Sequence, residues 1–457
     1  MNFYDSKKRN NLKKTLKTSK NIKIILKIDT FGSLKLKYKM KLNPRILFIL
    51  SYLICFSSFS QKLSLKDALK LGLNQNLELK SLAFNVESHE ADTITARLRQ
   101  NPIFNTQDLF LLNSNYFPNG TSMFGPKNRQ TWFQVTKPFV LPQHRNNKIA
   151  LAHQNLVQEQ KNYKESERAI LMNIANIWIT VWYSQKQLSI LLEAKQNLDS
   201  LVSINKLRFK NQVISQSDLM RVELLANQFS VRIKTANQDV NNALTQLRYE
   251  LGGNQNVSID TADNDLFSSY QFAKYDSLLQ FALTNRSDIA VSKSTVDVSI
   301  ANIKYQKSLV LPTPELGVII NPQNTIPYAG FYGTIVFPIF SRNQGEIKKS
   351  MILKNQAEIS LLKNQKLIQS EVLSAFQTYD LQRSNLQKYT TYIEMSDKIL
   401  SNVKYNYLAG GTNIVDYLEA QRSWIETQQQ YFDIQYNYRS SLVQMLYTTG
   451  IIQNIIK

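Results

Sequence analysis

An internal repeat is the feature that most restricts how this 457-residue chain can fold. Residues 209–252 align without a gap to residues 407–450 when the sequence is shifted by 198 positions. Paired residues in this alignment include Phe209 with Tyr407, Asp218 with Asp416, Leu244 with Leu442 and Gly252 with Gly450. The two copies of a duplicated unit are expected to fold alike, so the sequence predicts two matching halves.

A second alignment, at a shift of 210 positions, extends the duplication towards the start of the chain. It pairs Leu69 with Leu279, Ala91 with Ala301 and Pro102 with Pro312. Together the two alignments predict a first repeat at 61–253, a polar linker at 254–274 and a second repeat at 275–457.

Each copy of the first aligned stretch is predicted to form a helix, a tight turn and a second helix. In the second copy, glycines can adopt the positive φ that ends a helix, and Thr412 or Asn413 can cap the next helix. In the first copy, Ser215 and Ser217 are the capping candidates. The residues of the two turns are Gln212, Val213, Ile214, Ser215, Gly410, Gly411, Thr412 and Asn413.

The helices predicted in each repeat differ greatly in length. The first helix of each repeat is expected at 64–100 and 276–310, the long helix at 143–209 and 343–407, and the short helix at 215–251 and 413–447. At 1.5 Å per residue, each long helix would extend about 100 Å. Apolar residues recur at multiples of seven along the first long helix, which is typical of a coiled coil. Trp178 and Trp182 lie outside those rows, so this helix is expected to pack on more than one neighbour.

Two short segments rich in phenylalanine and β-branched residues follow the first helix of each repeat. They are predicted to form β-hairpins, at 103–112 with 130–139 and at 315–321 with 329–337. Apolar residues alternate along them and aromatic residues flank them, as in transmembrane strands. From the strands alone, an ordinary soluble hairpin is an equally good interpretation.

The start of the chain has the composition of an export signal. Residues 1–39 are strongly basic and are predicted to be an upstream extension, either disordered or not translated. Residues 40–60 contain two basic residues, an apolar run and small residues at the spacing of a cleavage site, which predicts a signal peptide. A membrane anchor is the alternative, but about fourteen apolar residues are too few to span a bilayer.

Removal of the signal changes the charge of the chain. Residues 1–60 hold fourteen of the 55 basic residues and two of the 34 acidic ones, so the net charge of +21 falls to about +9. The remaining charges are spread along helices, so no nucleic-acid partner is expected. The only cysteine, Cys55, lies within the predicted signal peptide, so the exported chain is expected to contain no disulfide and no thiolate metal site.

The sequence contains no recognisable catalytic constellation. The three histidines, His89, His144 and His153, fall into no metal-ligand spacing, and no phosphate-binding loop or nucleophile elbow is present. We therefore expect no enzyme activity, no cofactor and no bound metal. Asp416 and Glu419 lie on one face at the start of a helix, where the helix dipole alone accounts for them.

The whole duplicated region resembles the TolC family of outer membrane efflux proteins. The resemblance rests on the turn motif YLAGGTNIVDYLEAQ and its copy FKNQVISQSDLMRVE, the segment LKDALKLGLNQNLELK and its copy YDSLLQFALTNRSDIA, and the strand ends VTKPFVLP and IVFPIF. It implies a mainly α-helical fold with a small β part. Three chains would form a long antiparallel coiled-coil α-helical barrel and a twelve-stranded transmembrane β-barrel, with four strands from each chain.

The resemblance also implies sites and partners. The helix turns would form a periplasmic tip that meets an adaptor and an inner-membrane pump, and the barrel would contact outer membrane lipid. By position, Asp416 and Glu419 correspond to an acidic ring at the gate, and Tyr407, Ser217 and Asp218 to the latch that holds it shut. Thr412 stands where the family has an arginine, so a charged latch is missing there.

These expectations predict a homotrimeric channel that gives passive exit to the substrates of a tripartite efflux or type I secretion system. The alternative is a soluble periplasmic coiled-coil adaptor or scaffold protein. That alternative accounts for the helical hairpins but not for two matched pairs of strands with aromatic flanks.

Overall fold

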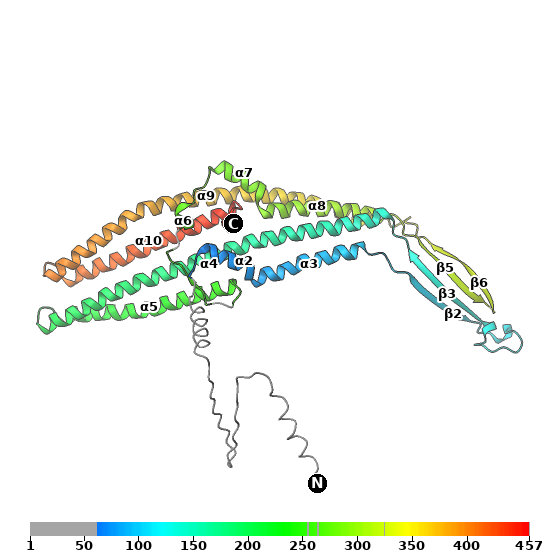
Figure 1. The fold of residues 1–457 in the computed structure, drawn as a ribbon, viewed down its shortest axis with the longest axis horizontal. Helices are drawn as coiled ribbons and strands as arrows, with labels where there is room; N and C mark the ends of the chain where they lie inside the picture. Colours follow the sequence, from blue (N-terminus) through cyan, green and yellow to red (C-terminus); the bar gives the residue numbers. More distant parts are fainter. Residues whose placement is uncertain (1–61, 254–255, 263–264, 324, 457) are drawn as a thin grey trace, which may run out of the picture. The chain divides into compact units, whose positions relative to one another are not determined.

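The computed structural model describes residues 62–253, 256–262, 265–323 and 325–456. The basic extension and the signal peptide predicted at 1–60 lie outside the described residues, as does part of the predicted linker. The fold of the described part is mainly α-helical, with one small antiparallel sheet (Figure 1). This confirms the predicted fold class, although a single chain does not show a closed barrel.

Two hairpins of long helices dominate the structure. In the first repeat α4 (Pro142–Lys210) is followed by α5 (Gln216–Glu250), and in the second α9 (Gln344–Ala409) is followed by α10 (Ile414–Thr448). The observed ends lie within two residues of the predicted ones. Within each hairpin the two helices pack on each other, and α10 also packs on α4, which joins the two repeats.

The prediction of one unbroken first helix in each repeat was wrong. The first repeat has α2 (Leu65–Gln75) and α3 (Leu77–Arg97), and the second has α7 (Tyr275–Asn285) and α8 (Ser287–Ser308). The residues at the breaks, Asn76 and Arg286, have ψ values of 127° and 135°, which are outside the α-helical range. Asn76 and Arg286 are 210 positions apart, which is the shift of the second alignment, so the break is itself part of the repeat.

The two predicted hairpins join into one four-stranded antiparallel sheet. Its strands are β2 (Ile103–Phe110), β3 (Arg129–Pro138), β5 (Glu315–Gln323) and β6 (Ile326–Thr334), in the order β2-β3-β5-β6. The central pairing sets Thr136 opposite Gly317. A Cβ atom at Gly317 would lie 2.2 Å from the Val135 carbonyl oxygen, so only glycine allows this approach.

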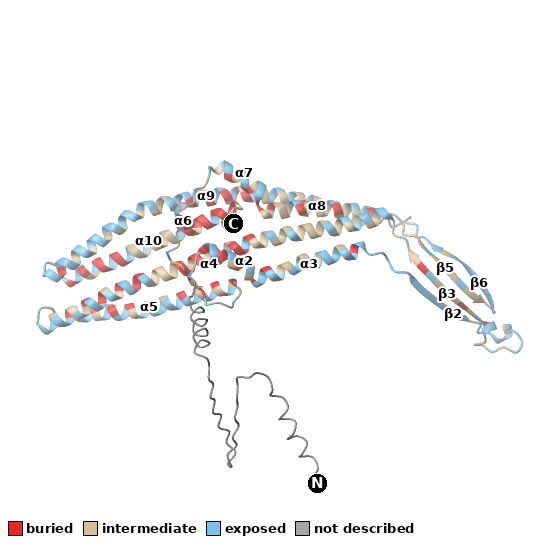
Figure 2. Cartoon of the chain, viewed as in Figure 1, coloured by how far each residue is buried: buried red, intermediate tan, exposed pale blue. Residues whose placement is uncertain are grey.

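The main core lies where α2, α4 and α10 meet, as the buried residues in Figure 2 show. Trp178 and Trp182 of α4 are fully buried there, which confirms that this helix packs on several neighbours. Their indole N–H groups donate to the carbonyl oxygens of Leu63 and Thr261, each at 3.2 Å. Leu63 belongs to β1 (Lys62–Leu63), which pairs in parallel with β4 (Ser258–Ile259). The strand after the predicted signal peptide and residues 258–261 of the predicted linker are thus fixed on the core.

The remaining elements are short: the helix α6 (Asp265–Ser269) and the 3-10 helices η1 (Ser114–Tyr116), η2 (Pro126–Asn128) and η3 (Ile452–Ile455). Among the described residues, none of the helices is both long and apolar enough to cross a membrane.

Candidate functional site

The turns between the long and short helices form the candidate site, and the chain shapes both turns alike. The long helix ends at a residue with positive φ, which is Gln212 (61°) in the first repeat and Gly410 (84°) in the second. The side chain of Ser215 then accepts from the Asp218 N–H at 3.1 Å, and that of Asn413 accepts from the Asp416 N–H at 2.9 Å. Of the capping candidates, Ser215 and Asn413 are therefore the caps.

A small apolar cluster holds the two turns together. It consists of residues from α4, α5, α9 and α10, namely Leu201, Val222, Tyr407, Ile414 and Tyr417. The rings of Tyr407 and Tyr417 stack with their centroids 5.5 Å apart. Burial and then the neighbouring Tyr407 raise the pKa of Tyr417, so its phenol is neutral at physiological pH.

Tyr407 links the second tip to the first through a buried hydrogen bond. Its hydroxyl donates to Oδ1 of Asn205 on α4 at 2.7 Å, and Asn205 is fully buried. Within one chain, Tyr407 therefore bonds to Asn205 rather than to Ser217 or Asp218. Ser217 is exposed, and the Asp218 carboxylate accepts from the hydroxyl of Ser215 at 2.7 Å.

Arg208 makes a further link between the tips that was missed in the sequence. Its guanidinium lies 4.8 Å from the centre of the Tyr407 ring and donates to the carbonyl oxygens of Leu408, at 2.9 Å, and Tyr407, at 3.2 Å. The last carbonyls of a helix carry partial negative charge, so a cation is favoured there. The only signal in the sequence was a basic residue in the last turn of α4, and nothing showed that it would reach α9.

The two carboxylates of the predicted acidic ring are both exposed near the start of α10. Asp416 accepts from the hydroxyl of Thr412 at 2.6 Å, so Thr412 orients this carboxylate. Glu419 borders a groove between α5 and α10 that also contains Arg221, Arg232 and Arg422. Both acids are therefore open to solvent in the single chain.

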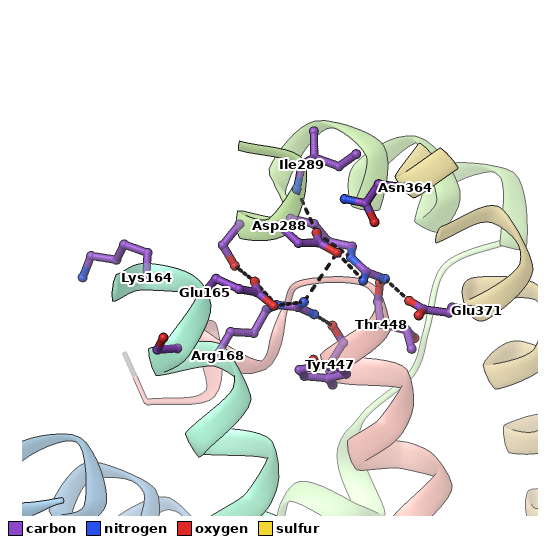
Figure 3. A network of polar contacts seen from close by, with 12 residues as sticks. Lys164, Glu165, Arg168, Asp288, Ile289, Asn364, Glu371, Tyr447 and Thr448 are labelled. Atoms are coloured by element: carbon purple, nitrogen blue, oxygen red, sulfur yellow. Dashed lines mark hydrogen bonds and ion pairs between the residues drawn. The ribbon is translucent and has the colours of Figure 1, made fainter. Parts of the chain in front are cut away.

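A second polar cluster lies far from the turns, where α4, α8, α9 and α10 meet (Figure 3). Two buried arginines occupy it. Arg168 donates to the carbonyl oxygen of Tyr447 at 2.9 Å and lies 4.0 Å from the centre of its ring. Arg286 donates to the carbonyl oxygen of Thr448 at 3.0 Å. The two arginines thus satisfy the C-terminal end of α10.

Carboxylates balance these two charges. Arg168 pairs with Glu165 at 2.6 Å, and Arg286 pairs with Asp288 and with Glu371, each at 2.7 Å. Burial alone would raise the pKa of Asp288, but the hydrogen bond and charge of Arg286 outweigh burial and hold that pKa below its usual value. The cluster is structural, because every charge in it has a partner within the protein.

The described residues contain no group of three or more histidine, cysteine, aspartate or glutamate side chains that could hold a metal ion. The polar groups at the turns cap helices and connect the tips. The geometry of the site is that of a junction between helix ends.

Comparison with known proteins identifies the class of the chain. Residues 278–450, most of the second repeat, match the family model described as outer membrane efflux protein. The cobalt-zinc-cadmium resistance protein CzcC of Cupriavidus metallidurans is 22% identical over 382 residues, which is 81% of this chain and 86% of that protein.

Solved structures of channels share the fold. The structure of CusC superposes with a TM-score of 0.71 at 17% identity and covers 86% of this chain and 94% of its own. The open state of the Neisseria gonorrhoeae MtrE outer membrane channel gives a TM-score of 0.68 at 14% identity, with 84% and 88% of the two chains covered. The Campylobacter jejuni CmeC outer membrane channel gives 0.67 at 15% identity, with 84% and 85% covered. Most of the second repeat therefore matches the outer membrane efflux protein family, and the chain shares the fold of these channels.

Proposed function

We propose that three copies of this chain form a channel through the outer membrane, through which substrates of a tripartite efflux or type I secretion system leave the cell. The chain itself catalyses no reaction, and the energy for export comes from its partners. The observation that carries the proposal is a four-stranded sheet, with open edges in the single chain, that is joined directly to helices about 100 Å long.

The sheet requires closure if it is to enter a membrane. In one chain β2 and β6 are its outer strands, and their outer backbone groups would lack hydrogen bonds in lipid. Pairing β6 of one copy with β2 of the next removes both edges, and three copies then give twelve strands. Leu316, Val318 and Ile320 alternate along β5 with their side chains exposed, which is the apolar face that lipid would cover.

The helices extend from the sheet into the periplasm and end at the tip. There the turn residues 212–215 and 410–413 would contact a periplasmic adaptor, and through it an inner-membrane pump. Most of these residues are exposed, and Val213 places an apolar side chain in solvent. The two tips differ in sequence, so an adaptor would meet two kinds of turn alternating around the ring.

The gate is placed at the same tip. Asp416 and Glu419 of three copies would form an acidic ring, and Tyr407, Ser217 and Asp218 would form the latch. Within one chain Tyr407 and Arg208 already hold the second tip to the first. Opening must therefore either separate the two hairpins or move them as one unit.

Divalent metal ions are the first cargo to test, since CzcC is named for resistance to cobalt, zinc and cadmium. Neither the family nor the similar structures support the alternative of a soluble periplasmic scaffold.

The test is to purify the protein from outer membranes in detergent, measure its mass and record conductance in a planar bilayer. We expect a trimer that forms small, long-lived, cation-preferring channels. A monomer that needs no detergent and gives no conductance would overturn the proposal. Deletion of the chain should also sensitise cells to exported ions if metal ions are the cargo.

A further inference from the structure

The contacts of the two repeats are equivalent residue by residue. In the first repeat Leu79 of α3 packs with Ile170 and Ile174 of α4 in one buried cluster. In the second repeat the residues at shifts of 210 and 198, Ile289 of α8 with Ile368 and Val372 of α9, form another buried cluster. The same two shifts therefore relate α3 to α8 and α4 to α9 in space as well as in sequence.

The surroundings of α3 and α8 differ in one respect. Helix α8 packs on α9 of its own repeat and also on α4 of the first repeat, whereas α3 packs on α4 of its own repeat. A position that is buried on α8 but exposed on α3 must therefore be one that faces the extra neighbour, α4.

One row of residues, spaced seven apart, shows this difference. On α8, Ser294, Ala301 and Ser308 are 0%, 8% and 1% exposed, and Ser287 begins the same row. The equivalent row is Leu77, Phe84 and Ala91 on α3 and Leu98 directly after it, and its three large side chains are 63%, 65% and 67% exposed. The row is thus covered on α8, and its equivalent on α3 is uncovered and more apolar. Apolar side chains in such a row are typical of a helix–helix contact.

The matching face of α9 is also uncovered. The positions on α4 that correspond to Ile352 and Ile359 are half-buried, yet these two isoleucines are 50% and 65% exposed. Each chain therefore presents both halves of one contact, the row on α3 and the face on α9. A chain that carries two complementary surfaces at different places can form a closed ring with its own copies.

Charges at the two uncovered faces are also complementary. Within the chain, Nη2 of Arg168 on α4 lies 3.7 Å from Oδ2 of Asp288 on α8. The equivalent residues are Lys366 on α9 and Glu78 on α3, and both are exposed. Lys366 and Glu78 carry charges of the same signs as Arg168 and Asp288, but they lie on the two uncovered faces of one chain.

We propose that α9 of one copy packs on α3 of the next as α4 packs on α8 within the chain, so that Lys366 pairs with Glu78 of the neighbouring copy. The Arg168–Asp288 pair of Figure 3 thus has a counterpart that only a second copy can complete. This inference rests on the proposed trimer and defines which residues meet in it.

Cysteine cross-linking tests the register. Nε2 of Gln158 donates to Oγ1 of Thr295 at 2.8 Å across α4 and α8, and the equivalent pair is Gln356 and Asn85. With Cys55→Ser removing the chain's own thiol, Asn85→Cys together with Gln356→Cys should give covalent trimers on oxidation. The matched control is Glu87→Cys with Gln356→Cys, because Glu87 and its equivalent Asp297 are both exposed in the chain. This control should stay monomeric on a denaturing gel.

Exchange of charges tests the ion pair. Lys366→Glu and Glu78→Lys should each raise the dissociation constant of the assembly, by about fivefold for an ion pair of this exposure. The variant with both changes should return to the wild-type value. Additive weakening in the double variant would overturn the pairing.

The mass measured in detergent distinguishes a failure of this interface from a failure of the proposed channel. A trimer in which the Asn85 and Gln356 variants do not cross-link would overturn this interface and leave the channel intact. A protein that is not trimeric would overturn both.

Discussion

Asn76 donates a hydrogen bond of 2.9 Å from its side-chain amide to the main-chain carbonyl oxygen of Glu250. Its equivalent, Arg286, does the same for Thr448 at 3.0 Å. In both repeats the residue that breaks the first helix therefore secures the C-terminal end of the short helix. The amide of Asn76 and the guanidinium of Arg286 perform this task at the same place, but only Arg286 carries charge into the core.

Substitution Arg286→Met should strongly destabilise the fold. It leaves the carbonyl of Thr448 and the carboxylates of Asp288 and Glu371 without their main donor, and removal of one partner of a buried pair costs about 3–5 kcal/mol. Chemical denaturation of the detergent-purified protein would measure the change. Asn76→Ala is the matched control and should cost only about 1–2 kcal/mol, since it removes the hydrogen bonds of an uncharged side chain and leaves no buried charge without a partner. Equal losses in the two variants would contradict this account.

The same cluster should make stability depend on acid. The pKa of Asp288 in the folded protein lies below its usual value, because the hydrogen bond and charge of Arg286 outweigh burial. Its ionised form therefore stabilises the fold above a pH of about 4, and this contribution is lost as the pH falls through the folded pKa. Denaturation curves at pH 7 and pH 3 should show a smaller difference for Asp288→Asn than for the wild type. An unchanged difference would assign the acid sensitivity to other carboxylates.

Loss of the Tyr407 hydroxyl should loosen the tip. Tyr407→Phe removes the 2.7 Å bond to Asn205 and leaves a buried amide without this donor, at a cost of about 1–2 kcal/mol. If the tip is the gate, single channels should then open more often in a planar bilayer. Tyr405→Phe is the control, since Tyr405 lies on the same helix but is largely exposed. Identical gating of the two variants would remove Tyr407 from the latch.

The acidic ring can be tested by its effect on cations. Replacing Asp416 and Glu419 with alanine should raise single-channel conductance and weaken block by divalent or trivalent cations, because both exposed carboxylates would otherwise attract these ions to the narrowest point. Glu426→Ala serves as the control, since Glu426 lies further along α10 and pairs with Arg422 at 3.0 Å. Unchanged block in the double variant would show that the ring lies elsewhere.

Local patterns in the sequence were enough to predict most of the secondary structure. The seven-residue rows, the glycine turn at Gly410 and the caps Ser215 and Asn413 act within a few residues of the chain, so their effect can be read without knowing what packs on them. The duplication added a check, because each prediction in one repeat had to hold in the other. The predicted gate residues remain predictions, since their roles concern contacts between copies.

Tertiary structure alone decided the features that depend on partners far along the chain. The break at Asn76 had no glycine or proline to signal it. The Asn76 side chain caps α3 through the Leu79 N–H, and it is fixed on the core by its bond to Glu250, 174 positions later. The joining of β3 to β5 depends on Gly317 lying against Val135, and Arg208 becomes a link between the tips only when α9 ends beside it. Turns and helix periods are set by neighbours in sequence, whereas these contacts require the two repeats to meet. The sequence therefore determined the repeating unit, and packing determined how the two units hold each other.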